Sequence, residues 1–446
     1  MRIVNRIVHV TQSGTGTWLE RLGRALSTGS HNRRLALRAA ICEVNDHQAI
    51  AETTFVEWDA AEPYGELLAA TQVATPRRKS HQEQRFAVVQ IVPTGVRCEI
   101  GGYAGDACPA TNLLAASADL LITHPNAVNA SELNEMAANV LYVEGRSLDD
   151  LMLGQVALAP SSANRIGTFV DPTGMAYLDE VVHTLNAARA AAGIDCALYS
   201  VGREEIGVTI EWSAHGCALG TVRRPEIILE MVDHLLSQGA DAIGGVSVIH
   251  GVTAQQFSNH LDGNLPNPSG GIEAIITHLI SRAFRVPTAH APLPYYQAIK
   301  RRSTHNPRAS AEFISTPHYF CVLKGLARAP RLVPVESLQR VAPHLISLNH
   351  IGALVVPASC LGGLAVLAAD FNRIPIIAVR ENRTVLDVSN ERMGLQNVIS
   401  VESYPEAAGV VLALRKGICL ESVRRPLGCA VRLDAPVGRL GAAAVS

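Results

Sequence analysis

Apolar residues along this chain alternate between short continuous runs and stretches with helical spacing. Phe86–Val92 and Asp119–Thr123 are mainly apolar runs of strand length, and Thr111–Ala118 between them suits a helix. A strand, a helix and a second strand of this kind form the βαβ unit of a parallel sheet, whose strands are buried on both faces. We therefore predict that parallel sheets form the core.

The same alternation recurs along the rest of the chain. The further predicted strands are Ile166–Val170, Cys196–Val201, Ala242–Ile249, Ile351–Pro357 and Ile374–Val379, and the further predicted helices are Ala176–Ala192, Pro225–Leu236, Glu273–Phe284, Leu364–Asp370 and Pro405–Arg415. This pattern predicts an α/β fold of two Rossmann-like lobes with mostly parallel sheets. The lobes are expected over residues 86–250 and 251–420, and a C-terminal tail over residues 421–446.

A different pattern precedes Phe86. Arg2–Val10 has the composition of a strand, and Trp18–Leu26 has helical spacing. Two further strand-like runs, Arg34–Val44 and Ala49–Trp58, flank a short polar turn, which is typical of a β-hairpin. Residues 1–85 are therefore predicted to form a small N-terminal α+β unit.

Composition narrows the classes of partner. The 38 Lys and Arg residues are interspersed with 40 Asp and Glu, and the formal net charge is -2, so no strong field is expected to attract nucleic acid or an anionic membrane. No apolar run reaches the roughly 18 residues that span a bilayer, and the N-terminus lacks a signal-peptide pattern. We expect a cytoplasmic protein with a small-molecule substrate, no nucleic-acid or membrane partner, and homo-oligomerisation as an open option.

The cysteines are numerous but scattered. There are 9 of them, an odd number, and none forms a C-x-x-C pair. This distribution argues against a disulfide framework or a structural zinc site. Buried free thiols are expected instead.

Small and polar residues cluster where the predicted strands end. The first strand of the core is followed by Thr94, Gly95, Gly101, Gly102, Gly105 and Asp106, and the next by His124, Asn126 and Asn129. The carboxyl ends of parallel strands meet at one edge of a sheet, where α/β proteins bind their ligands. We therefore predict a ligand site at this edge.

These residue types suit acid–base chemistry. The glycines allow the backbone to approach a ligand closely. His124, which Pro125 keeps out of helical geometry, is a candidate proton carrier near neutral pH. Asn126 and Asn129 are candidates to orient a carboxylate or carbonyl. A structural interpretation stays open, in which Asp106 caps a helix, the glycines serve turn geometry and the asparagines satisfy a loop network.

Later strand and helix ends add further candidates. They are Glu144, Gly270, Gly271, Glu273, His290, Glu381 and Asn382. Glu144, His290 and Glu381 are predicted to act with His124 and Asp106 in catalysis, and the others are predicted ligand contacts. The long polar segment over residues 250–267 is expected to be a mobile flap over the site, a contact with a partner, or an ordinary surface loop.

The sequence requires no cofactor, and a divalent metal stays an option. His124, His250 and His290 fall at predicted strand ends and are the histidines placed to converge on a metal, although their spacings are long and irregular. The histidines that fall inside predicted helices, where packing or surface roles are expected, are His183, His234 and His278.

Several motifs in the core resemble one known family. They are Ile91-Val92-Pro93-Thr94-Gly95, Gly101-Gly102-Tyr103-Ala104-Gly105-Asp106-Ala107, Thr123-His124-Pro125-Asn126, Tyr142-Val143-Glu144-Gly145, Gly270-Gly271-Ile272-Glu273-Ala274, Pro287-Thr288-Ala289-His290-Ala291-Pro292, Gly325-Leu326-Ala327-Arg328-Ala329-Pro330 and Ile374-Pro375-Ile376-Ile377-Ala378-Val379-Arg380-Glu381-Asn382. Together they resemble the domain of unknown function 3326 family over about Phe86 to Glu402. The resemblance implies kinship and brings no function with it, and the N-terminal unit lies outside it.

Cys360 supports a second similarity, at the level of fold only. The strand Ile351–Pro357, followed by Cys360 in a tight turn, is similar in outline to the units of aspartate and glutamate racemases, in which a cysteine moves a proton at an α-carbon. Leu361 and Gly362 stand where those enzymes have Asn-Thr, and no second equivalent cysteine is evident.

The sequence therefore predicts a soluble enzyme that acts on a small, polar, anionic metabolite by acid–base chemistry, an isomerase or lyase before a hydrolase. One alternative is a non-catalytic protein that binds or senses a metabolite. Another is a transferase with a phosphorylated or nucleotide-sugar donor, whose phosphate the glycine turns would hold.

Overall fold

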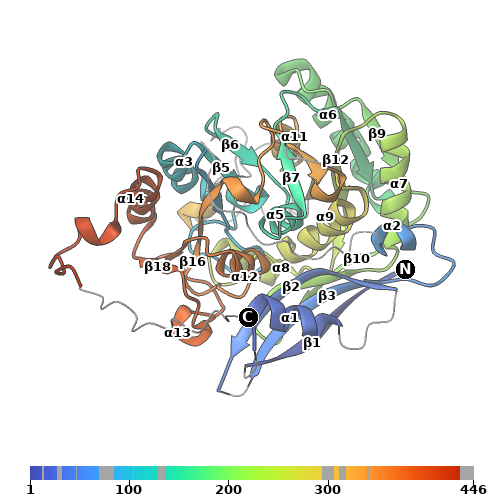
Figure 1. Ribbon diagram of the computed structural model, residues 1–446. Helices are drawn as coiled ribbons and strands as arrows, with labels where there is room; N and C mark the ends of the chain where they lie inside the picture. Colours follow the sequence, from blue (N-terminus) through green and yellow to red (C-terminus); the bar gives the residue numbers. More distant parts are fainter. Residues whose placement is uncertain are drawn as a thin grey trace, which may run out of the picture.

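The molecule consists of two α/β lobes with a smaller β layer beneath them, as Figure 1 shows. The structure is a computed structural model that describes residues 1–12, 15–27, 33–46, 48–69, 85–103, 105–128, 136–293, 306–310, 318–338 and 342–431. Parallel sheets form the lobes and an antiparallel sheet forms the N-terminal unit. The predicted fold class is confirmed.

The first lobe is built on a six-stranded sheet whose neighbouring strands are all parallel. In spatial order the strands are β18 (Val398–Val401), β17 (Ile376–Val379), β16 (Ile351–Pro357), β4 (Ala87–Gln90), β5 (Leu120–Thr123) and β6 (Val140–Tyr142). Val88 packs on the side of two helices, α3 (Cys108–Ser117) and α14 (Tyr404–Arg415). Val89 packs on the opposite side, toward α5 (Gly145–Met152) and α12 (Leu364–Phe371). Helices on both faces explain why the strands are continuous apolar runs.

The strand order of this sheet crosses the predicted boundary at residue 250. Strands β4–β6 come from one predicted lobe and β16–β18 from the other, yet β4 pairs with β16. The chain between them forms the second lobe as an insertion. Periodicity identifies a buried strand but not its partner, because a strand is equally apolar in either sheet.

The second lobe contains a four-stranded parallel sheet. In spatial order its strands are β14 (Thr288–Pro292), β12 (Ala242–Ser247), β8 (Ile166–Val170) and β9 (Leu198–Val201). One face is covered by α6 (Leu178–Ala192) and α11 (His318–Leu326), and the other by α7 (Pro225–Ser237) and α9 (Gly270–Phe284).

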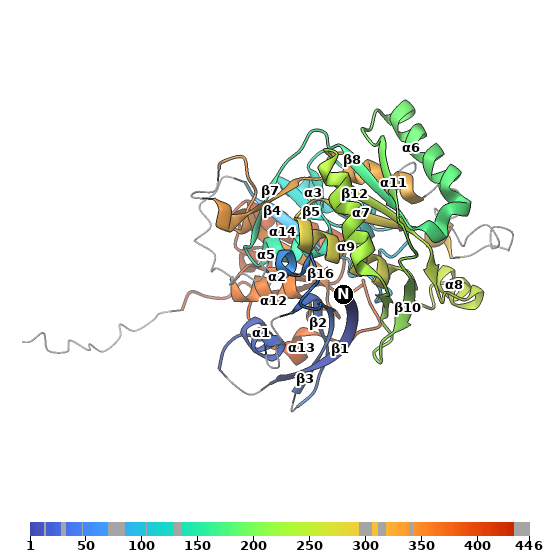
Figure 2. The same ribbon diagram turned by 90° about the vertical axis from the view of Figure 1, so that its right-hand side faces the viewer.

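The N-terminal unit is an antiparallel sheet of order β1 (Arg2–Thr11), β3 (Gln48–Glu57) and β2 (Arg34–Val44), with α1 (Trp18–Ser27) packed against it. The pairing of β2 with β3 confirms the predicted hairpin. Figure 2 shows the sheet beneath the lobes. The Ile41 N–H donates to the Gly362 carbonyl at 3.0 Å, and the Trp18 indole donates to the Met393 carbonyl at 2.7 Å, so the unit is docked on the first lobe.

Smaller elements complete the described chain. They are the sheet of β11 (Ala218–Val222), β10 (Val208–Trp212) and β13 (Ile249–His250), the pair β7 (Val156–Ala159) and β15 (Arg331–Pro334), and the helices α2 (Gly65–Ala69), α4 (Pro125–Val128), α8 (Ala254–Leu261) and α13 (Asn390–Met393). Helix α8 lies inside the segment over residues 250–267 and begins with a capping box at Thr253. This segment is therefore more ordered than the predicted flap or surface loop. Within the described ranges, no helix combines the length and apolarity needed to cross a membrane.

Helices α5 and α9 join the two lobes along a line of buried polar pairs. The Ser147 and Ser281 hydroxyl oxygens are 2.6 Å apart. Arg282 donates to both carboxylate oxygens of Asp150 at 3.1 Å, and Arg146 donates to Asp150 at 2.6 Å. Because buried charges are costly unless they are paired, these contacts define how the two helices sit against each other.

Replacing Gly362 with alanine is expected to weaken the docking of the N-terminal unit. A Cβ at this position would lie 2.0 Å from the Ile41 carbonyl oxygen, so β2 would have to move. We expect a loss of about 1–3 kcal/mol in the free energy of unfolding, measured by chemical denaturation. Gly363→Ala is the matched control, because a Cβ there meets nothing within 4 Å. Equal stability of the two variants would contradict this packing.

Candidate functional site

A cavity of about 280 Å³ lies between the two lobes and strand β2. Val356 of β16 and His124, directly after β5, line it from the first lobe, and His290 of β14 lines it from the second. Arg38 and Ile41 of β2 line it from the N-terminal unit. All three parts of the molecule therefore build one site.

Many of the predicted site residues meet in this cavity. Those that line it are Thr94, Gly102, His124, Asn126, Glu144, Gly270, Gly271, Glu273 and His290. Those that are described but do not line it are Gly95, Gly101, Gly105, Asp106, His250, Glu381 and Asn382. Asn129 lies outside the described residues. Further ionisable groups that line the cavity and were not predicted as site residues include Arg38, Asp149, His278 and His318.

Glu144 and His278 form a carboxylate–imidazole pair in the cavity wall. Glu144 Oε1 lies 2.5 Å from His278 Nδ1, and the carboxylate also accepts from the backbone N–H groups of Arg146 and Ser147 at 3.0 and 2.9 Å. Burial alone would raise the pKa of Glu144, but the His278 charge and these hydrogen bonds outweigh burial and lower it to about 2. Glu144 is therefore anionic. Within the described chain, His278 Nε2 has no hydrogen-bond partner.

Asp149 is a second carboxyl group in the same wall. Burial raises its pKa to about 6, and the opposing influence of Arg146 and His278 is weaker. Asp149 also accepts the N–H of Ala365 at 3.1 Å, at the start of α12. Glu144 and Asp149 are therefore two neighbouring carboxyl groups whose pKa values are shifted in opposite directions.

Arg38 brings a positive charge to the cavity. Its NH1 group is buried and has no hydrogen-bond partner among the residues that the structure describes. A guanidinium group presents donors that match carboxylate and phosphate oxygens. Arg38 is therefore suited to bind an anionic ligand.

Both ring nitrogens of His290 have a side-chain partner. Its Nε2 lies 2.9 Å from the Ser247 hydroxyl and its Nδ1 lies 3.3 Å from Glu273 Oε2. Ser247 is fully buried and does not line the cavity. This Ser–His–Glu arrangement therefore lacks a nucleophile that a cavity ligand could reach.

His124 lines the cavity in the neutral form. The Val92 N–H donates to its Nε2 at 3.0 Å, so this nitrogen carries no proton. Burial lowers the pKa of His124 to about 4, and the nearby Glu144 carboxylate only partly offsets burial. His124 is therefore held neutral in one tautomer. This state does not fit its predicted role as a proton carrier near neutral pH.

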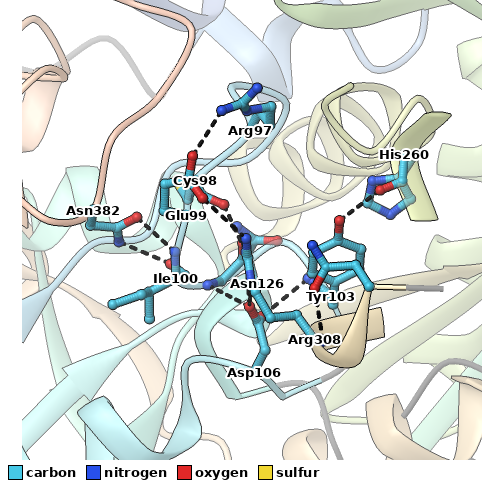
Figure 3. Close-up of polar contacts among 12 residues, drawn as sticks. Arg97, Cys98, Glu99, Ile100, Tyr103, Asp106, Asn126, His260, Arg308 and Asn382 are labelled. Carbon is cyan, nitrogen blue, oxygen red and sulfur yellow. Dashed lines mark hydrogen bonds and ion pairs between the residues drawn. The ribbon is translucent and has the colours of Figure 1, made fainter. Parts of the chain in front are cut away.

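Asp106 does not line the cavity but organises the glycine-rich loop through the polar contacts drawn in Figure 3. Its carboxylate accepts the N–H groups of Gly101 and Tyr103 at 3.0 and 3.2 Å, and Arg308 Nε donates to it at 3.1 Å. Burial nevertheless raises its pKa. Tyr103 donates its hydroxyl to the His260 carbonyl at 2.6 Å. Because Asp106 occupies the N–H groups of Gly101 and Tyr103, these two groups are not free to hold a phosphate. The N-cap residue of α3 is Ala107, which has no side-chain cap, so Asp106 does not cap this helix.

Glu381 and Asn382 have structural contacts. Glu381 accepts the Tyr404 N–H at 2.8 Å, at the start of α14. Asn382 is fully buried and bonds both backbone groups of Ile100 at 2.9 Å. Gly95 also has a structural reason to be glycine, because a Cβ there would lie 2.6 Å from the Ala218 carbonyl oxygen. Neither the predicted catalytic role of Glu381 nor ligand binding by Asn382 fits these contacts.

The three histidines suggested for a metal do not converge. His250 Nε2 lies 3.4 Å from Glu205 Oε1, beside a second hollow lined by Arg2 and Arg223. It is therefore separated from His124 and His290, which line the main cavity.

Cys360 lines the cavity as a neutral thiol. Burial raises its pKa to about 12, and the hydrogen bond with Thr384 at 3.1 Å only partly offsets burial. A proton-transferring cysteine needs an accessible thiolate. The similarity to racemases therefore does not extend to the state of this cysteine.

His278 could have been found from the pattern of α9. Its apolar residues, such as Ile275, Ile276 and Leu279, leave a polar stripe over Glu273, Thr277 and Ser281 with helical spacing. His278 lies beside that stripe. Such a stripe in a buried helix indicates a polar contact with another element, but the sequence does not identify α5 as that element.

The comparisons with known proteins give kinship without an activity. A family model described as "Protein of unknown function (DUF3326)" matches residues 87–424, which confirms the predicted resemblance. An uncharacterized lipoprotein of Synechococcus sp. is 36% identical over 335 residues, covering 74% of this chain and 91% of the relative. No solved structure matches the chain.

The name of the relative corrects the predicted location. A lipoprotein is held at a membrane by attached lipid, and this chain shares 36% identity with a protein so named. The prediction of a cytoplasmic protein is therefore wrong. It relied on finding neither a long apolar run nor a signal-peptide pattern, and a search for apolar spans detects membrane-crossing helices but not lipid anchors.

The neutral state of His124 predicts that acid weakens the fold. The folded chain protonates His124 near pH 4, whereas the unfolded chain does so near 6.5. Between these values the unfolded chain binds more protons, so the free energy of unfolding falls as the pH falls, by at most about 1.4 kcal/mol per pH unit from this residue. His124→Gln is expected to reduce that slope in denaturation measured between pH 4 and 6.5.

His183→Gln serves as the control, because His183 is exposed on α6. It should keep the slope of the unmodified chain. A slope that His124→Gln leaves unchanged would contradict a buried neutral His124.

Proposed function

This chain belongs to the DUF3326 family of proteins of unknown function, and we propose that it is an enzyme that moves protons on a small anionic metabolite in the cavity described above. The observation that carries this proposal is the Glu144–His278 pair at the cavity wall. The reaction class is an isomerase or lyase. The volume of about 280 Å³ suits a metabolite-sized ligand.

His278 is the proposed base. The anionic Glu144 accepts a hydrogen bond from Nδ1, which leaves Nε2 to take a proton from the ligand. A carboxylate that orients an imidazole in this way also stabilises the imidazolium that forms. His278 therefore replaces His124 as the proton carrier of the proposal, and Glu144 keeps a role as its partner.

Asp149 is the proposed acid. Its pKa, raised to about 6 by burial, keeps a fraction of the carboxyl group protonated near neutral pH. Asp149 and His278 both line the cavity.

Arg38 and Asn126 are the proposed ligand contacts. The buried NH1 group of Arg38 would donate to the anionic group of the ligand. Asn126 donates its amide hydrogens to the carbonyls of Val92 and Pro93 at 2.9 and 3.3 Å, so its oxygen is presented as an acceptor.

Proton transfer fits the cavity better than hydrolysis through a nucleophile. The Cys360 thiol is neutral, and Ser247 is buried away from the cavity. The phosphorylated-donor alternative is also less well supported, because Asp106 occupies two N–H groups of the glycine-rich loop, those of Gly101 and Tyr103.

Exchange of a ligand C–H with solvent tests the proposed base. Short-chain carboxylates, amino acids and sugar phosphates would be screened by thermal shift, and binders would be followed by proton NMR in D₂O. His278→Gln is expected to slow exchange by about 10²–10⁴-fold with binding kept, because it removes the base. Arg38→Gln is expected to weaken binding itself.

His183→Gln is the matched control for His278→Gln, because it changes an exposed histidine in another helix. Binding of an anion without exchange in the unmodified chain would contradict an enzyme and favour the metabolite-binding alternative. Equal exchange rates for His278→Gln and His183→Gln would contradict the role of His278.

The proposed acid predicts a pH dependence. With Asp149 protonated in the active form, kcat is expected to fall as the pH rises through about 6. Asp149→Asn keeps an oxygen for the Ala365 N–H but cannot give up a proton. A pH–rate profile of this variant that keeps both the rate and the limb near pH 6 would contradict the assignment.

A further inference from the structure

A second group of ionisable side chains lies outside the cavity, where the N-terminal sheet meets the hairpin of β10 and β11. Cys42 comes from β2, Glu52 from β3 and His215 from the hairpin turn. Their ligand atoms all lie within 4.8 Å of one another. Cys42 and Glu52 are 4% and 2% exposed. A thiol, a carboxyl and an imidazole are the groups that bind zinc in proteins.

The imidazole is already oriented for this purpose. His215 Nδ1 lies 2.7 Å from Glu52 Oε1, and the other ring nitrogen, Nε2, lies 3.3 Å from Glu43 Oε2. A histidine that binds a metal commonly bonds a carboxylate through its other ring nitrogen, and Glu43 is placed to be that carboxylate here. The Ser213 hydroxyl accepts the N–H groups of His215 and Cys217 at 3.2 and 3.1 Å, which holds the turn that presents both side chains.

One oxygen of the cluster is unexplained without a ligand. Glu52 Oε2 is buried and has no hydrogen-bond partner in the described part of the chain. A buried carboxylate oxygen without a donor is costly and is expected to face a water or an ion. The oxygen belongs to the same carboxylate that contacts His215.

Cys217 lies beside this three-residue cluster. A hydrogen bond between the thiols of Cys217 and Cys42 lowers the pKa of Cys217 and raises that of Cys42. Arg38 also lies close enough to favour the thiolate forms. The two sulfur atoms are therefore neighbours, although their positions in the sequence are far apart.

We propose that Cys42, Glu52 and His215 bind a divalent cation of the zinc type, with the neighbouring Cys217 thiol available as a fourth ligand. Four protein ligands would leave no open position, as in structural zinc sites. The cation would link β2 and β3 to the β10–β11 hairpin, and thereby hold the N-terminal unit against the second lobe. The site is independent of the proposed function, and it differs from the expectation that the scattered cysteines are buried free thiols without a structural zinc site.

Metal loading of the full chain tests this site. Reduced protein would be treated with EDTA, incubated with Zn²⁺ or Co²⁺ and desalted, and its metal content measured. We expect one bound metal per chain, a thiolate-to-cobalt charge-transfer band, and a higher melting temperature with Zn²⁺. Cys42→Ser and His215→Gln should lose all three. Glu43→Gln should weaken binding by about 10–100-fold.

Cys419→Ser is the matched control, because Cys419 is an exposed thiol far from the cluster in sequence. It should behave as the unmodified chain. Absence of bound metal in the unmodified chain, or equal loading of Cys42→Ser and Cys419→Ser, would overturn the proposal. A Cys42–Cys217 disulfide found by peptide mapping of the protein as purified would also overturn it.

A second measurement does not depend on variants that fold. Zn²⁺ is expected to protect Cys42 and Cys217 from alkylation in the unmodified chain, mapped by mass spectrometry, and to leave Cys419 reactive. Equal alkylation of all three cysteines with and without Zn²⁺ would contradict the site.

Discussion

The contact between α5 and α9 is the constraint on which the rest of the site depends. It pairs Glu144 with His278, Ser147 with Ser281 and Asp150 with Arg282, so each turn of α5 meets a polar partner on α9. These groups are buried, and a buried charge is tolerated only with a partner in good geometry. A shift of one helix along the other would break every pair at once. The contact therefore defines both how the lobes meet and where His278 lies.

This contact also gives two carboxyl groups on neighbouring turns, Glu144 and Asp149, pKa values that are shifted in opposite directions. Glu144 receives donors from the start of α5 and from α9, and its pKa falls to about 2. Asp149 has fewer such donors, and burial raises its pKa to about 6. The difference comes from the charge of His278 and from the hydrogen bonds, and not from the residue types. A cavity lined by both groups can hold one anionic and one partly protonated carboxyl group at the same pH.

Polar residues at strand ends serve the fold as well as the cavity. The sequence predicted that such residues would gather, and His124, Asn126, Glu144 and His290 do line one cavity. Asp106 follows the same pattern but binds backbone N–H groups and Arg308. A ligand in the cavity and a backbone N–H group satisfy a buried polar side chain equally well. The local sequence therefore cannot distinguish a residue that faces a ligand from one that holds a loop.

The sequence by itself determined the elements, because burial on one face or two imposes a periodicity that is visible in each segment. Strand Ile166–Val170, the hairpin of β2 and β3 and the α/β class follow from that periodicity alone. Tertiary structure decided the pairing of β4 with β16, the meeting of His278 with Glu144 and the approach of Cys42 to Cys217. These contacts join residues far apart in the chain, and their partners are selected by the packing of whole helices and sheets, which no local pattern records.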